Sequence, residues 1–130
     1  SILNLLKQLQ QKLGISYIFI AHDMSVVQHI SDRILVMYRG RVVESGSYEE
    51  ICSHPRHPYT VHLIDAIPVA DPSVPCSPLR CAQTTEETET GCAYYPRCIN
   101  RQQDCLNFDY RKTELSPGHI CSCLYPESTC

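Results

Sequence analysis

The sequence predicts an α/β fold, and three patterns in its first half support this prediction. Apolar residues recur at helical spacing over the first thirteen positions, and an uncharged run rich in β-branched and aromatic side chains, Tyr17 to Ala21, follows. A second apolar run, Ile34 to Met37, is followed by a short return segment. Amphipathic helices that alternate with short apolar strands are typical of a sheet covered by helices.

The first helix is expected to begin at Ile2 and to end at Gly14, a residue suited to a left-handed C-cap. The run Tyr17 to Ala21 carries no charge, which favours a strand buried on both faces, as in a parallel sheet. A helix, a glycine turn and a buried strand together form the second half of a βαβ crossover. The first strand of that crossover would lie before Ser1.

His22 follows this expected strand directly. A polar side chain at the carboxyl end of such a strand is placed in the crevice where open α/β sheets bind ligands. A histidine here can equally cap the next helix or satisfy a loop carbonyl, so both interpretations stay open from spacing alone. Asp23 is better suited to capping the next helix than to acting as a catalytic acid.

The elements expected after His22 follow from turn and capping signals. The predicted order is a short helix from Met24 to Ile30, a strand from Ile34 to Met37, a turn at Arg39-Gly40, a return strand at Val42 to Glu44, a helix opened by the capping box Ser47 and Glu50, and a helix that starts at His57-Pro58 and ends before Pro68.

Composition limits the classes of function. The chain has 130 residues with 11 basic and 14 acidic side chains and a net charge of -3, and it has no basic block, so nucleic acid is not expected as a partner. No apolar stretch approaches the roughly 20 residues of a transmembrane helix, which predicts a soluble or peripheral chain. The chain opens in helical periodicity without a methionine or a leader and is expected to be part of a longer protein.

Nine cysteines are distributed unevenly, since only Cys52 lies in the first half. The segment from Pro68 to Gly91 is rich in proline, threonine and glutamate and reads as a linker or mobile loop. An odd number of cysteines without a secretory signal argues against a simple disulfide framework. A metal site in the second half is the better interpretation.

The order of motifs now identifies a family resemblance. The segments IAHD, ISDR, ILVMYRG, GRVVESG and SYEEI resemble the back half of an ABC-transporter ATPase domain, which is a P-loop NTPase fold. The later segments HPRHPYTVHLIDAIPVADP, GCAYYPRC and PGHICSC resemble the C-terminal extension of the ATPase subunits of oligopeptide and dipeptide importers. The resemblance implies three parts: the C-terminal part of the ATPase domain (1–53), a helix and proline-rich linker (54–90), and a cysteine-rich metal-binding module with irregular structure (91–130).

The resemblance implies that His22 is the switch histidine, which reaches the terminal phosphate of ATP and stabilises charge without covalent chemistry. The parent subunit is then expected to bind ATP with magnesium and to hydrolyse it. The phosphate loop G-x-x-x-x-G-K-[ST], the signature loop and the strand that ends in the magnesium-holding acid are absent from the 130 residues. This chain alone is therefore expected neither to bind ATP usefully nor to hydrolyse it.

The cysteines Cys92, Cys98, Cys105 and Cys123 resemble the four-cysteine motif that the importer extension associates with a [4Fe-4S] cluster. Thiolates are soft anionic ligands that suit such a cluster. Spacing alone leaves a structural zinc site equally open, and disulfides are a third possibility. Cys121 lies two residues from Cys123 and competes with it for the fourth position. The bland interpretation of the module is a staple that folds a tail with little core.

The resemblance also implies partners. These are a second ABC ATPase subunit, transmembrane permease subunits and, indirectly, a solute-binding protein, with the chain peripheral on the cytoplasmic face of the inner membrane. The expected function is to power the import of peptides, and the transported solute itself is not encoded here. The alternative is a metal-binding regulatory or interaction module that contacts the partner ATPase or the membrane subunits.

Overall fold

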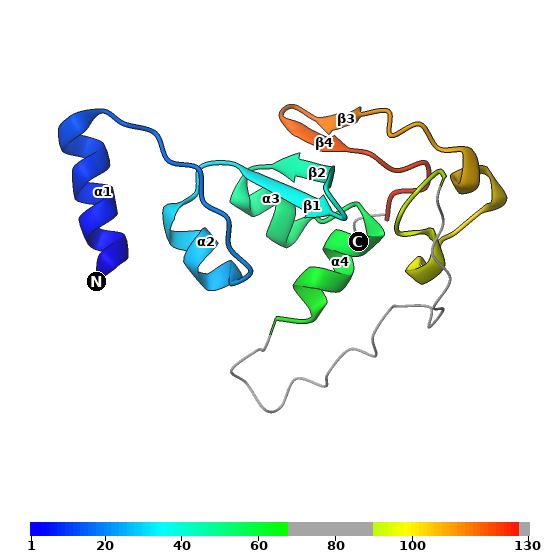
Figure 1. The fold of residues 1–130 in the computed structure, drawn as a ribbon, viewed down its shortest axis with the longest axis horizontal. Helices are drawn as coiled ribbons and strands as arrows, with labels where there is room; N and C mark the ends of the chain where they lie inside the picture. The colour runs from blue at the N-terminus through cyan, green and yellow to red at the C-terminus, as the bar shows by residue number, and fades with distance from the viewer. Residues whose placement is uncertain (68–89, 128–130) are drawn as a thin grey trace. The chain divides into compact units, whose positions relative to one another are not determined.

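The structure, a computed structural model, describes residues 1–67 and 90–127. It divides into two compact units, Ser1–Asp32 and Arg33–Cys130 (Figure 1). The first unit contains α1 (Ile2–Leu13) and α2 (Met24–Ile30). The second contains β1 (Ile34–Tyr38), β2 (Arg41–Gly46), α3 (Tyr48–Ser53), α4 (Pro58–Asp65), the 3-10 helices η1 (Tyr95–Arg97) and η2 (Gln103–Asn107), β3 (Thr113–Ser116) and β4 (His119–Cys121).

Both helices of the first unit have the ends that their sequence predicts. The C-cap of α1 is Gly14 in the left-handed conformation at φ 63°, and the backbone N–H of Gly14 donates to the carbonyl of Gln10. Helix α2 begins after Asp23, whose carboxylate accepts the backbone N–H of Ser25 at 2.9 Å. Neither helix has a buried residue. Capping and periodicity therefore define these helices, while none of their apolar residues is fully buried.

The expected strand from Tyr17 to Ala21 is wrong for this structure, since the segment between the two helices is extended loop. Ile18 is 96% exposed and Ile20 is 100% exposed. A strand needs a neighbour for its backbone N–H and C=O groups, and no described strand pairs with this segment. The rings of Tyr17 and Phe19 contact each other, with centroids 5.6 Å apart.

The hairpin of β1 and β2 is confirmed. Arg39 and Gly40, at φ 48° and 80°, form its turn, and Leu35 pairs with Ser45 across the ladder. The sheet of the second unit has the order β1-β2-β4-β3, with every pair antiparallel. The expectation of a parallel sheet is therefore wrong within the described residues. Tight turns connect β1 to β2 and β3 to β4, and β2 pairs with β4 from the C-terminal part of the chain in antiparallel orientation.

The cysteine-rich extension contributes half of this sheet. Strands β3 and β4 form a hairpin that lies alongside β2 (Figure 1), with Glu44 opposite Cys121 and Ser45 opposite Ile120. The extension was expected to be irregular, and this is correct only for its loops and short 3-10 helices. The Pro117-Gly118 pair forms the hairpin turn, with Gly118 at φ 82°.

Helices α3 and α4 have the predicted starts. Ser47 and Glu50 form a capping box in which each side chain accepts the other residue's backbone N–H. His57 caps α4, since its Nδ1 accepts the backbone N–H of Tyr59 at 3.0 Å. An aromatic cluster then joins β1, α4 and the cysteine-rich loop: Tyr38, Tyr59 and Tyr94 have ring centroids 4.7 to 5.5 Å apart.

None of the helices in the described ranges has the length and apolar character that crossing a membrane requires.

Candidate functional site

The four cysteines with the predicted spacing all lie within the described part of the extension. Cys92 precedes η1, Cys98 follows it, Cys105 lies in η2, and Cys123 follows β4. All four are free thiols, and Cys98 and Cys105 are buried. We call these four residues the four-cysteine module.

Electrostatic effects between the thiols show that they are close to one another. The pKa of Cys98 is raised to about 11, mainly by burial and also by the nearby Cys92, Cys105 and Glu127. Burial also raises the pKa of Cys123 to about 12, and the other three thiols of the module all add to that increase. The pKa of Cys92 is raised as well, mainly by burial and also by Cys105. Every pair in the module is thus within electrostatic reach.

Cys121 belongs to a different environment. It lies in the β2–β4 ladder opposite Glu44, and burial is the main cause of its raised pKa, with Glu44 and Cys123 as the nearby charges that raise it further. Among the described residues, none of Cys92, Cys98 and Cys105 contributes to that increase. Of the two cysteines that compete for the fourth position, Cys123 is the one whose pKa the other three thiols raise.

Backbone amides point at three of the four sulfur atoms. The sulfur of Cys92 accepts N–H groups of Tyr94 and Tyr95, that of Cys98 accepts from Asn100, and that of Cys123 accepts from Tyr125. In each case the donor is two residues beyond the cysteine, with Tyr95 as an additional donor. Such N–H groups lower the thiol pKa and favour thiolates, the form that binds metal.

The backbone of the module is held by close approaches. The N–H of Cys92 donates to the carbonyl of Cys105 at 2.9 Å. The approach requires Gly91, at φ 76°, since a Cβ atom on it would lie 2.3 Å from the carbonyl oxygen of Leu106. The Tyr110 hydroxyl accepts the N–H of Ala93 at 2.7 Å, and the Arg41 guanidinium lies 4.3 Å from the centroid of the Tyr110 ring.

The donor set fits a thiolate-bound group, although the side chains do not converge on one point. Within residues 1–67 and 90–127, no group of three or more His, Cys, Asp or Glu side chains is positioned to hold a metal ion. Tetrahedral zinc with Zn–S bonds of about 2.3 Å would bring four sulfur atoms to within about 3.8 Å of each other. A four-iron cluster binds each cysteine through a different iron, so its four sulfur ligands lie farther apart than those of a single zinc ion.

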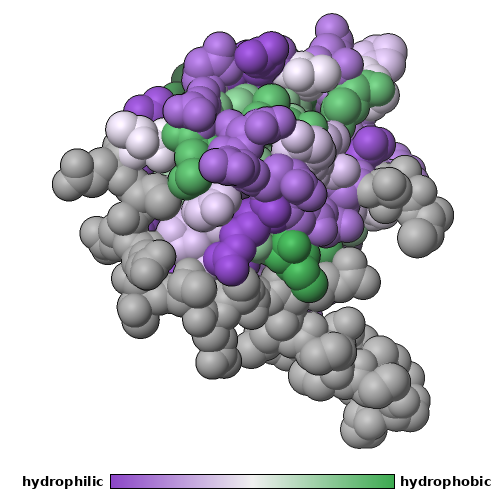
Figure 2. All heavy atoms as spheres, turned by 90° about the vertical axis from the view of Figure 1, so that its right-hand side faces the viewer, coloured by the Kyte–Doolittle hydropathy of each residue, from purple (hydrophilic) through white to green (hydrophobic). Residues whose placement is uncertain are grey.

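The visible face around η1 and η2 is mostly hydrophilic in its described part, with hydrophobic residues in small separate groups (Figure 2). Tyr94 and Pro96 of this loop are buried, whereas Arg97 is exposed. The Tyr94 ring packs against Tyr38, His57 and Tyr59.

His22 lies in the first unit and is exposed, one residue before the N-cap of α2. Asp23 accepts the N–H of Ser25 at 2.9 Å and its hydroxyl at 2.6 Å, and these bonds hold the pKa of Asp23 below its usual value. Asp23 is therefore a helix cap, as predicted. His22 and the four-cysteine module lie in separate units.

Two polar residues that the sequence reasoning did not single out as functional are buried beside the module. Glu44 on β2 is 1% exposed and His119 on β4 is 3% exposed, and His119 Nε2 lies 2.5 Å from Glu44 Oε1. The histidine in PGHICSC, two residues before Cys121, was the available signal. Cys76, Cys81, Cys130 and the proline-rich linker lie outside the described residues.

Comparison with known proteins shows what the chain is similar to. Residues 43–105 match the family model of the oligopeptide/dipeptide transporter, C-terminal region. The matched range covers just under half of the chain and runs from β2 to the third cysteine of the module. Its relatives are ATP-binding proteins: it is 43% identical over 130 residues to the oligopeptide transport ATP-binding protein OppF of Escherichia coli, covering 95% of this chain and 38% of that protein.

Dipeptide transport proteins are similar to the chain at comparable levels. The dipeptide transport ATP-binding protein DppF of Haemophilus influenzae is 37% identical over 127 residues, covering 95% of this chain and 39% of that protein. DppF of Escherichia coli is 43% identical over 126 residues, with coverages of 95% and 37%. The chain thus spans about two fifths of the length of these relatives.

Proposed function

We propose that the chain is the C-terminal part of an ATP-binding subunit that powers the import of oligopeptides or dipeptides. The observation that carries the proposal is the similarity over 95% of the chain to OppF and DppF proteins. The whole subunit would bind ATP with magnesium and couple hydrolysis to transport. The 130 residues alone would not, because the phosphate loop, the signature loop and the magnesium-holding acid are not among them.

In this proposal His22 acts as the switch histidine. Its position supports the role, since it is exposed and directly precedes the N-terminus of α2, while Asp23 is already engaged as the cap. An imidazole in such a loop can donate to a phosphate oxygen and stabilise the charge that develops there.

The test is His22→Ala in the full-length subunit, assembled with its transporter. We expect ATP hydrolysis and peptide uptake to fall by about 100-fold or more, the usual effect of removing one donor to a developing charge. His29→Ala, which removes an exposed histidine in the last turn of α2, is the matched control and should keep both activities. Equal activity of the two variants would contradict the role of His22.

We further propose that Cys92, Cys98, Cys105 and Cys123 hold a [4Fe-4S] cluster, with zinc as the alternative. Support comes from the effects of the four thiols on one another's pKa, the backbone amides directed at three sulfur atoms, and the soft anionic character of four thiolates. When bound, the cluster supplies four iron–thiolate bonds that cross-link the loops and the end of β4. The residues themselves position the thiols and exclude water from them, which is consistent with a structural staple.

Metal analysis of anaerobically purified protein tests this assignment. We expect about four irons and four labile sulfides per chain, as the cluster type requires. Cys123→Ser should lose both, whereas Cys121→Ser, the matched control two residues away, should retain them. Stoichiometric zinc without labile sulfide would overturn the cluster in favour of the zinc site.

The same proposal assigns partners by resemblance to the family. The subunit would pair with a second ABC ATPase subunit, contact transmembrane permease subunits at the cytoplasmic face of the membrane, and depend indirectly on a solute-binding protein. The names of the relatives, which are oligopeptide and dipeptide transport ATP-binding proteins, support a transporter assembly.

A further inference from the structure

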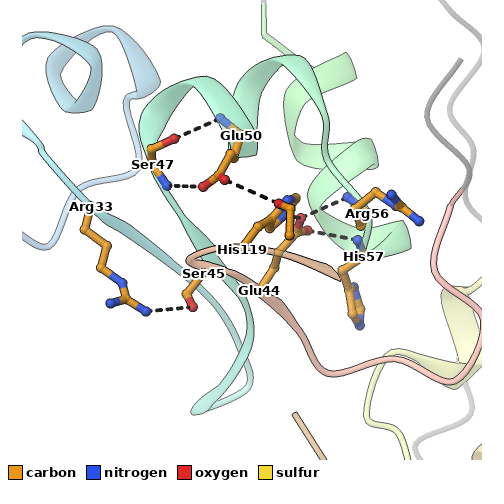
Figure 3. A network of polar contacts seen from close by, with 9 residues as sticks. Arg33, Glu44, Ser45, Ser47, Glu50, Arg56, His57 and His119 are labelled. Atoms are coloured by element: carbon orange, nitrogen blue, oxygen red, sulfur yellow. Dashed lines mark hydrogen bonds and ion pairs between the residues drawn. The ribbon is translucent and has the colours of Figure 1, made fainter. Parts of the chain in front are cut away.

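Glu44 is a buried carboxylate at the junction of β2, α4 and β4. Its Oε1 accepts the backbone N–H of Arg56 at 2.9 Å and lies 2.5 Å from His119 Nε2, and its Oε2 accepts the backbone N–H of His57 at 2.9 Å (Figure 3). Because a carboxylate only accepts hydrogen bonds, His119 Nε2 is the donor in this contact. Three donors from two distant parts of the chain therefore meet on one side chain.

Among amino-acid side chains of this size, only a carboxylate can satisfy this arrangement. Glutamine has a single carbonyl oxygen, and its NH2 group would face at least one of the three donors. A buried donor left without an acceptor is costly, and hydrogen bonds to a charged group are stronger than neutral ones. The site thus depends on the chemistry of Glu44 as well as on its volume.

The contacts of Glu44 anchor the segment that carries Cys123 at both ends. On one side, His119 binds Glu44, and the N–H of Ser122 donates to the carbonyl of Val43 at 2.8 Å. On the other side, the N–H of Glu127 donates to the carbonyl of Arg56 at 2.6 Å. Arg56 is itself held by Glu44 through its N–H, so both anchors depend on the same carboxylate.

Two of the remaining thiols depend on a different set of contacts. Cys92 and Cys105 are joined through their backbones at the close approach that Gly91 allows, and Tyr110 holds Ala93. None of these contacts involves Glu44. Cys98 differs, because Asn100, two residues after it, donates through Nδ2 to Glu127 Oε1 at 2.9 Å. A change at Glu44 should therefore act on Cys123 more than on Cys92 and Cys105.

We propose that Glu44 is a positioning residue for Cys123, acting through His119 and through the Arg56–His57 amides. It holds β4 and the segment after it where Cys123 meets the other three thiols. Glu44, a residue of β2, thereby affects how well the four-cysteine module retains a bound metal. The positioning itself needs no bound metal, whereas its effect on metal retention rests on the proposed function of the module.

The test measures the reactivity of each thiol in the full-length protein after anaerobic removal of metal with a chelator and reduction of the thiols. Iodoacetamide alkylation is followed at each cysteine by peptide mass spectrometry. In Glu44→Gln we expect Cys123 to react about tenfold faster, which corresponds to about 1.4 kcal/mol of lost protection. The rates of Cys92 and Cys105 should stay within about twofold of the wild type, a difference of about 0.4 kcal/mol.

Glu50→Gln is the matched control, because Glu50 is a neighbouring carboxylate that accepts a hydrogen bond from the same hairpin, from Ser116 Oγ at 3.4 Å, and holds none of the donors that meet on Glu44. Glutamine keeps the capping box with Ser47, so all four rates should remain those of the wild type. Circular dichroism checks that each variant is folded. If Glu44→Gln does not fold, His119→Met replaces it, since this change removes one donor and leaves Glu44 with its two backbone partners.

An equal increase at all four cysteines, or no increase at Cys123, in whichever of these variants folds would overturn the proposal. A second measurement follows the loss of bound iron or zinc to EDTA, and Glu44→Gln should shorten the half-life several-fold relative to Glu50→Gln. Wild-type protein that binds neither metal would reject the proposed function of the module, while the alkylation rates would still decide the role of Glu44. If Cys123 alone reacted faster while the half-life of the bound metal stayed unchanged, the effect of Glu44 on metal retention would be overturned.

Discussion

At the scale of single residues, His57 shows how a predicted helix start acquires a pH-sensitive group. The His57-Pro58 pair was predicted to begin a helix, and His57 does so through Nδ1, which accepts the N–H of Tyr59. His57 is 1% exposed, and its Nε2 has no hydrogen-bond partner among the described residues. Burial lowers the pKa of His57 to about 4. The neutral form, with its proton on Nε2, is therefore the form that the fold requires.

This pKa predicts a loss of stability in mild acid. His57 binds a proton near pH 6.5 in the unfolded chain and only near pH 4 in the folded chain. The contribution of neutral His57 to the free energy of unfolding is therefore complete above pH 6.5 and is lost as the pH falls towards 4. The shift corresponds to roughly 3 kcal/mol. Urea unfolding between pH 7.5 and 4.5 should show this loss in the wild type and a smaller loss in His57→Asn, which keeps an N-cap acceptor.

His62→Asn on the same helix is the control and should keep the wild-type pH dependence. The neighbours of His57 include the Glu44 carboxylate, which accepts its backbone N–H, and the Tyr94 ring at 5.9 Å. Both are retained in the two variants, so the difference between the variants isolates the imidazole. Identical pH dependence in all three proteins would contradict the prediction.

At the scale of elements, the loop that carries Cys92 depends on one glycine. Gly91→Ala would place a Cβ atom 2.3 Å from the Leu106 carbonyl oxygen and 2.5 Å from that of Cys105, at a positive φ. We expect the free energy of unfolding to fall by about 3 kcal/mol or more, since the clash involves backbone rather than a flexible side chain. Chemical denaturation of metal-free protein measures this change.

Gly118→Ala separates the clash from the backbone conformation. Gly118 also has a positive φ, at 82°, but a Cβ atom on it would meet nothing within 4 Å. This variant should lose only about 1–2 kcal/mol, the cost of a left-handed conformation for a residue with a side chain. If both glycine variants were equally destabilised, the close approach at Gly91 would not be the cause.

The elements that the sequence predicts correctly are those with local signals. Gly14, the capping box of Ser47 and Glu50, and the Arg39-Gly40 turn each act within a few residues, and all have the expected structure. The hairpin of β3 and β4 gave no such signal, because strands of four and three residues are too short to show alternation. The Glu44–His119 contact joins residues 75 positions apart, a pairing that no local pattern specifies.

The four-cysteine module was predicted for a different reason. Its spacing matched a family motif, and such a motif contains long-range information that local patterns lack. The choice of Cys123 over Cys121 stays a prediction. In the structure Cys121 pairs with Glu44 in the ladder, and Cys123 lies beyond the end of β4. Glu44 itself was read only as a strand residue.

At the scale of the whole molecule, the segment Tyr17 to Ala21 shows the limit of composition as a guide. Its side chains are those of a buried strand, yet Ile18 and Ile20 are almost fully exposed because no described strand lies beside them. Composition reports the environment for which a segment is suited, and burial also requires a partner. The chain spans about two fifths of its relatives, so we expect that partner in a protein of their full length.

Hydrogen exchange tests this expectation. In the 130-residue chain, the amides of residues 17–21 should exchange at the rate of an unstructured peptide, because the structure gives them no ladder. In a full-length subunit the same amides should be protected by orders of magnitude, as for a central strand that opens only with global unfolding. Residues 34–37 of β1, paired with β2 in this structure, serve as the internal reference and should be protected in both proteins.

Free exchange of residues 17–21 in the full-length subunit would refute the strand assignment. Protection in the short chain would instead show that these residues find a partner without the rest of the protein, for example by pairing with a second copy, as exposed apolar strands tend to do.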